Sequence, residues 1–168
     1  YVNPWPRPLQ QPHPPVWCPS QGSTETVEWA AKRRFPYLMV FTPIKRIAQI
    51  YGEYREACER NGYTASPYQL TVNVPIVVAE NDAKARAIAE KHVMWVFNTG
   101  LRMHPPFWRP PGYMTEASLR RILQNPPPLP SDLTFEQADR EGYIVYGSPS
   151  SVRDKLKIFS ADLQAGIV

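Results

Sequence analysis

Short apolar runs alternate with longer segments of helical spacing along almost the whole chain, and this alternation constrains the fold most strongly. The apolar runs, each suited to a buried strand, lie at residues 15–18, 37–41, 69–79 and 143–146. Helical spacing follows each of them, over residues 24–34, from Ile44 to the Asn61-Gly62 pair, over 82–97 and beyond Pro149. Strands that alternate with helices pair in parallel, with the helices as crossovers. The sequence therefore predicts an α/β fold of about four βα units.

Four βα units fit two architectures. They can form a doubly wound sheet, or they can form half of an eight-stranded (β/α)8 barrel of the TIM type. The spacing of apolar residues does not decide between the two.

Local signals predict further details. Thr42 stands where a side-chain cap of the second helix is expected, and Pro75 interrupts the third apolar run, which implies a bend or a bulge. In helix 82–97 the α-helical period directs Ile88 and His92 to the buried face.

Residues 98–133 form a long connection of irregular composition, with one short helix expected near residues 116–123. Connections of this length within a compact domain are commonly lids or binding segments. We therefore treat residues 1–168 as one domain that carries a lid-like insertion at 98–133.

Composition argues against several classes of protein. The net charge is only +4, and the dense basic run at residues 32–34 is typical of a solvated helix end rather than a nucleic-acid-binding stripe. No apolar stretch is long enough to span a membrane, and no signal segment opens the chain. Cys18 and Cys58 fit neither a disulfide framework nor a metal site, so they are expected to be buried, reduced thiols. We expect a cytoplasmic protein with no nucleic-acid or membrane partner.

The strongest candidate site is the loop Ser20-Gln21-Gly22-Ser23, which lies between the first strand and the first helix. A helix N-terminus offers backbone N–H groups and the positive end of the helix dipole, and hydroxyls beside a glycine let an anion approach closely. These four residues are the predicted phosphate-binding residues. Plain N-capping of the helix by Ser23 is the alternative.

Residues 147–151 follow the same logic after the last strand, but Ser148 and Pro149 already fit the cap and the first turn of a helix, so a structural role is favoured there. His13, His92 and His104 have no partner at triad or metal spacing. No metal site is predicted, and the catalytic residues remain unknown.

Four segments in order along the chain resemble the bacterial luciferase-like family of flavin-dependent monooxygenases. They are PRPLQQPHPPVW at residues 6–17, GSTET with WAA at 22–31, PPGYM at 110–114, and GSP at 147–149 followed by Val152. The resemblance implies a (β/α)8 barrel, represented here by its C-terminal half, with strands five to eight and the family's insertion after strand seven.

The resemblance also implies a chemistry. Members of this family bind reduced FMN, usually supplied by a separate flavin reductase, and use O2 to oxygenate a small organic substrate. By this resemblance Ser20, Gln21, Gly22 and Ser23 would hold the flavin phosphate, and Met39 and Phe41 would lie near the cofactor or substrate cavity. The complete protein is expected to be a homo-oligomer.

A complete barrel needs about 250 residues, so the chain is expected to be a fragment that is inactive alone, and its start at Tyr1 agrees with this. Two alternatives stay open. One is a deazaflavin-dependent oxidoreductase. The other is a non-enzymatic module that binds a phosphorylated ligand, or a partner protein through Phe107, Trp108 and Tyr113.

Overall fold

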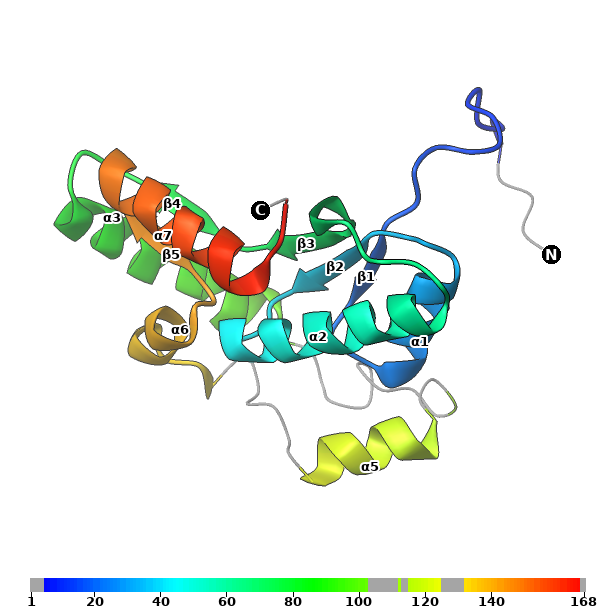
Figure 1. The fold of residues 1–168 in the computed structure, drawn as a ribbon. Coiled ribbons are helices and arrows are strands. Elements are labelled where there is room, and N and C mark those ends of the chain that lie inside the picture. Colours follow the sequence, from blue (N-terminus) through cyan, green and yellow to red (C-terminus); the bar gives the residue numbers. More distant parts are fainter. Residues whose placement is uncertain (1–4, 103–111, 113–114, 125–131, 167–168) are drawn as a thin grey trace.

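The computed structural model describes residues 5–102, 112, 115–124 and 132–166 (Figure 1). Most of the 110–114 motif, together with His104, Phe107, Trp108 and Tyr113, lies outside the described residues. The expectations that rest on these residues therefore stay predictions.

The described elements alternate as the sequence predicts. The first half contains β1 (Cys18–Ser20), α1 (Thr24–Lys32), β2 (Tyr37–Val40), α2 (Ile44–Arg60), a 3-10 turn η1 (Pro67–Gln69), β3 (Leu70–Asn73) and β4 (Ile76–Val78). The second half contains α3 (Asp82–Ile88), the π-helical turns η2 (Ala89–Val93) and η3 (Val96–Gly100), α5 (Glu116–Gln124), α6 (Phe135–Glu141), β5 (Val145–Gly147) and α7 (Pro149–Leu163). The short helix expected within the insertion is α5, so that prediction is confirmed.

The strands form two parallel sheets, one in the order β1-β2-β3 and the other of β4 and β5. The break falls at Pro75, which divides the third predicted run into β3 in one sheet and β4 in the other. Proline has no N–H for a sheet ladder, and here only its carbonyl is used, accepting from the backbone N–H of Val145 at 3.0 Å. The predicted bend is confirmed, and it transfers the chain from one sheet to the next.

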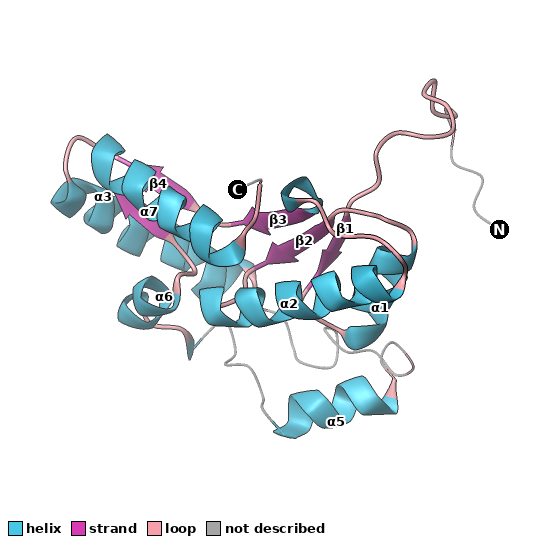
Figure 2. Cartoon of the chain, in the orientation of Figure 1, coloured by secondary structure: helices cyan, strands magenta, loops and turns pink. Residues whose placement is uncertain are grey.

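Helices α1 and α2 cover one face of the three-stranded sheet (Figure 2). Tyr37 and Met39 of β2 point into this layer, together with Leu70 and Val72 of β3, because alternate residues of a strand share a face. Opposite them, α2 contributes the large and fully buried side chains of Ile50, Tyr51 and Tyr54. This layer is the main core of the molecule.

The two-stranded sheet lies between α3 and α7 (Figure 1). Val77 and Tyr146 are paired in register and join the core formed with α3 and α6. Val78, on the opposite face of β4, borders α7. In the described residues the strands therefore form two sheets rather than a closed barrel, as expected for five short strands where eight are needed.

The helix predicted at 82–97 exists, but its buried face differs from the prediction. Ala85, Ala89, Met94 and Phe97 are buried, whereas Ile88 is 37% exposed and His92 is exposed. The π-helical turn at 89–93 widens the spacing of buried residues to five between Ala89 and Met94, because its hydrogen bonds join residues five apart. An α-helical period cannot anticipate this rotation.

Two other local predictions were wrong. Thr42 does not cap α2; its hydroxyl donates to the carbonyl of Val40 at 2.8 Å, and Pro43 occupies the cap position without a side-chain bond. The last strand begins at Val145 rather than Tyr143, because the N–H of Tyr143 is used to close the end of α6 on Ala138.

We predict that Met94→Ala lowers the free energy of unfolding by about 2 to 5 kcal/mol, because it leaves a cavity in a packed core. Ile88→Ala, the matched control on the exposed face, should change it by less than about 1 kcal/mol. Urea unfolding of both variants measures this. Equal losses would contradict the π-helical rotation of the buried face.

Candidate anion-binding site

The carboxyl ends of β1, β2 and β3 lie at one edge of their sheet because the three strands are parallel. The loop from Ser20 to Ser23 leaves β1 at this edge and enters α1 directly. The structure thus brings the four predicted residues together at the N-terminus of a nine-residue helix.

Ser23 caps that helix. Its backbone is extended, and its Oγ accepts from the N–H of Thr26 at 3.3 Å and lies 2.6 Å from the Thr26 hydroxyl. The structural role weighed for Ser23 is therefore confirmed. A cap of this kind leaves the remaining positive end of the helix facing the loop, so capping and anion binding are compatible.

Gly22 is required by the backbone. Its φ is +92°, and a Cβ at this position would lie 2.7 Å from Cδ1 of Ile50, so only glycine fits without displacement. The N–H of Gly22 donates to Oγ of Ser20 at 3.1 Å, which folds the loop tightly against the end of β1. Gln21 is exposed beside it.

Tyr37 lies next to this loop. From the sequence it was predicted only to be part of a buried strand. Tyr37 is fully buried, and the Ser20 side chain and the Gly22 backbone are close enough to its hydroxyl to influence its pKa. Burial dominates and raises the pKa of Tyr37 to about 12, so the phenol stays protonated. Among the described residues, however, its hydroxyl oxygen meets no partner with hydrogen-bond geometry.

The insertion is attached beside the same loop through Glu25, in the first turn of α1. Ser118 of α5 donates its hydroxyl to Oε2 of Glu25 at 2.6 Å, and the Thr115 hydroxyl donates to Oε1. These two bonds, with the backbone N–H of Glu25, lower the pKa of its carboxyl group. Figure 1 shows α5 below α1 and α2, on the side where α1 begins. The short helix of the insertion is therefore held next to the predicted phosphate site.

The two residues expected near the cavity have different surroundings. Met39 is fully buried in the core between the sheet and helices α1 and α2, so packing accounts for it. Phe41 follows β2 at the carboxyl edge with a left-handed φ of +47°, and its ring packs edge-on against Phe97. A bulky residue in this conformation is strained, and such strain concentrates at functional sites.

The second loop considered for phosphate, at 147–151, already holds an internal anion. Oδ1 of Asp82 accepts from the N–H of Ser148 at 2.6 Å, and Oδ2 accepts from the Ser151 hydroxyl at 3.0 Å. Ser148 caps α7, and Pro149 is its first residue, as favoured from the sequence. A carboxylate therefore occupies the place where a phosphate would bind.

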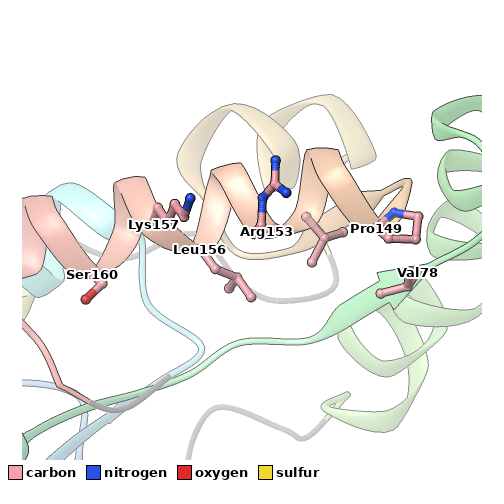
Figure 3. Close-up of a pocket in the computed structure, with 7 residues that line it drawn as sticks. Val78, Pro149, Arg153, Leu156, Lys157 and Ser160 are labelled. Carbon is pink, nitrogen blue, oxygen red and sulfur yellow. The ribbon is translucent and has the colours of Figure 1, made fainter.

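An apolar groove of about 550 Å³ lies between α7 and the end of β4 (Figure 3). It is lined by Val78, Pro149, Val152, Arg153, Leu156, Lys157 and Ser160. No carboxylate, histidine or thiol lines this groove, and its charged side chains are those of Arg153 and Lys157.

Within the described ranges no cluster of histidine, cysteine, aspartate and glutamate is arranged to hold a metal ion. Cys18 and Cys58 are free and buried, as predicted. Nor does any helix of the described part have the length and apolar character needed to cross a membrane.

The arrangement described above is that of an α/β protein in which a glycine-containing loop and a serine-capped helix N-terminus lie at the carboxyl edge of a parallel sheet. The sequence model of the luciferase-like monooxygenases matches residues 2–163, so the chain belongs to that family. No curated protein sequence matches the chain.

Several solved structures share the fold. One is the oxygenating constituent of 3,6-diketocamphane monooxygenase from the CAM plasmid of Pseudomonas putida, a type II Baeyer-Villiger monooxygenase in complex with FMN. It is 19% identical in sequence to this chain, with a TM-score of 0.61, and the match covers 91% of this chain and 40% of that protein. The monooxygenase RslO1 from Streptomyces bottropensis is 18% identical with a TM-score of 0.64, and the match covers 97% of this chain and 42% of that protein. Apo-MsnO8 is 23% identical with a TM-score of 0.56, and the match covers 95% of this chain and 45% of that protein. The chain thus spans less than half the length of these proteins.

We predict that Ser118→Ala releases α5 from α1 and speeds amide hydrogen exchange in α5 about tenfold, because the Glu25 carboxylate loses one of its two hydroxyl donors. Ser160→Ala, which removes a hydroxyl of α7 that donates to the carbonyl of Ala165 at 2.9 Å, costs one hydrogen bond outside α5 and is the control. Unchanged exchange in α5 would contradict the attachment.

The same attachment should depend on pH. The pKa of Glu25 is lowered in the folded chain, so the bond is fully present above the ordinary glutamate value of 4.5 and is lost as the pH falls through the folded value. Hydrogen exchange of α5, corrected for intrinsic rates, should therefore accelerate only on the acid side of 4.5.

Asp82 predicts a second pH effect. The Ser148 N–H and the Ser151 hydroxyl lower its pKa below 3.8, so its stabilising contribution is present above 3.8 and is lost as the pH falls below that value. Asp82→Asn should lower the melting temperature near neutral pH, with the difference from the unaltered chain shrinking toward pH 2. Asp162→Asn, at an exposed position of α7, should show no such trend.

Proposed function

We propose that this chain provides the flavin-phosphate half of the active site of an FMN-dependent monooxygenase, which uses reduced FMN and O2 to oxygenate a small organic substrate. The observation that carries the proposal is the β1–α1 loop. In a chain of the luciferase-like family, a glycine with a left-handed backbone and two serine hydroxyls stand together at a helix N-terminus.

The residues fit a phosphate chemically. A phosphate presents only acceptor oxygens when fully ionised, so it needs donors, and the loop supplies the Ser20 and Ser23 hydroxyls beside the positive end of the α1 dipole. Gly22 permits the left-handed turn that places Ser20 and Ser23 in one tight loop. Gln21 adds an exposed amide that can donate from the rim.

The chain's own groups would bind and orient the cofactor. The loop would fix the phosphate end, the carboxyl edge with Phe41 would lie beneath the rest of the ligand, and α5 would exclude water from one side through its attachment to Glu25. When bound, the flavin supplies the redox chemistry. We assign no catalytic residue, since the matched enzymes are more than twice as long as this chain.

The further parts of the proposal follow the family. A separate flavin reductase would supply the reduced FMN, the complete protein would be a homo-oligomer, and it would act in the cytoplasm. The FMN-bound structural neighbour supports the choice of FMN over a deazaflavin.

Titration with oxidised FMN and with riboflavin tests the phosphate site directly, because the two ligands differ only by the phosphate. Quenching of Trp17 and Trp29, which are 40% and 44% exposed and flank the loop in sequence, reports binding. We expect FMN to bind at least about tenfold more tightly than riboflavin, as charge-assisted hydrogen bonds to a phosphate require.

Gln21→Glu places a negative charge at the rim of the loop without altering buried packing. It should weaken FMN binding about tenfold and leave riboflavin binding unchanged. Gln10→Glu, at an exposed position before β1, adds the same charge away from the loop and serves as the control. Equal affinity for FMN and riboflavin, or equal effects of the two substitutions, would refute the phosphate site.

A further inference from the structure

The hydroxyl of Tyr37 is the least satisfied polar group near the proposed phosphate site. Its side chain is fully buried, so water does not reach it, and no described group accepts its proton. A buried tyrosine hydroxyl without a partner is costly, and native proteins rarely keep one. A partner for this hydroxyl is therefore expected in some state of the protein.

The neighbouring tyrosines show that this core satisfies phenol groups elsewhere. Tyr54 stacks on Tyr37 with ring centroids 5.4 Å apart, and its hydroxyl donates to the carbonyl of Phe35 at 2.8 Å. The Tyr51 hydroxyl donates to the carbonyl of Thr71. Among these three neighbouring tyrosines, only the hydroxyl of Tyr37, which lies beside the loop, has no partner in the described residues.

Strand pairing explains why Tyr37 faces the loop. Tyr37 lies opposite Cys18, and Ser20 is two residues further along β1, on the same face of the sheet. A long side chain that leans along its strand reaches that diagonal neighbour. The Ser20 hydroxyl and the Gly22 backbone are accordingly its polar neighbours, and both act to lower its pKa against the larger effect of burial.

The hydrogen-bonding capacity of Ser20 links Tyr37 to the loop. A serine hydroxyl has two lone pairs and one proton. One lone pair already accepts the Gly22 N–H at 3.1 Å. If the second accepts the Tyr37 proton, the only remaining capacity of Ser20 is to donate its own proton, which then points away from the core and toward the loop.

Resting on the proposed function, we infer that Tyr37 is a positioning residue for the phosphate: it donates to Ser20 when the loop is occupied and so fixes the Ser20 hydroxyl as a donor to the ligand. The small closure of the loop that forms this bond also satisfies the buried phenol. Part of the affinity for phosphate thus comes from a group that never touches the ligand.

Tyr37→Phe tests the inference, because it removes the hydroxyl and keeps the ring. FMN affinity should fall about tenfold, the effect of losing one charge-assisted hydrogen bond, while riboflavin affinity stays the same. The melting temperature should be unchanged or raised, since the hydroxyl lost had no partner. Tyr54→Phe, the control in the same stack, should lower the melting temperature and leave the ratio of FMN to riboflavin affinity unaltered.

A double-mutant cycle with Ser20→Ala separates positioning from general disturbance. If Tyr37 acts through Ser20, then Tyr37→Phe has no further effect on FMN affinity once Ser20 is alanine. Additive losses, or an unchanged FMN to riboflavin ratio in Tyr37→Phe, would overturn the inference. If the unaltered chain itself shows no preference for FMN over riboflavin, the proposed function fails and this inference fails with it.

Discussion

The parallel pairing of β1 with β2 and β3, packed on α1 and α2, is the constraint on which the rest of the structure depends. It aligns the carboxyl ends of three strands at one edge, and it buries the tyrosine layer that holds α2 in place. Ile50 of that helix lies so close to Gly22 that a Cβ at this position would displace the Ile50 side chain. The shape of the candidate site is thus set by core packing rather than by the loop alone.

The two helix N-termini that follow β1 and β5 have similar loops but differ in what their polar groups bind. Both begin with a serine cap, and both stand after a strand. At α7 the carboxylate of Asp82 takes the backbone N–H and a hydroxyl, so the positive end is neutralised from within. At α1 the carboxylate of Glu25 accepts from the hydroxyls of Ser118 and Thr115 in addition to its own backbone N–H, so most of its bonds go to the insertion. For this reason we propose the first loop, rather than the second, as the site of an external anion.

The alternation of strands and helices, the break at Pro75 and the helix within the insertion could be predicted from the sequence, since each depends on residues close in sequence. The exposed Ile88 could not be predicted, because a π-helical turn rotates the helix without a sequence signal. The role of Tyr37 could not be predicted from the sequence either. Its role depends on strand register and on a missing partner, and in the sequence it is one apolar residue among five. The family, by contrast, was evident from motifs spread along the chain and is confirmed.

Amide chemical shifts followed by NMR during addition of FMN test the central claim most directly. We predict that the largest changes fall on Gly22, Ser23 and the first turn of α1, and that riboflavin produces much smaller changes at these positions. Changes centred instead on the loop at 147–151 or on the groove along α7, with little change at Gly22 and Ser23, would contradict it.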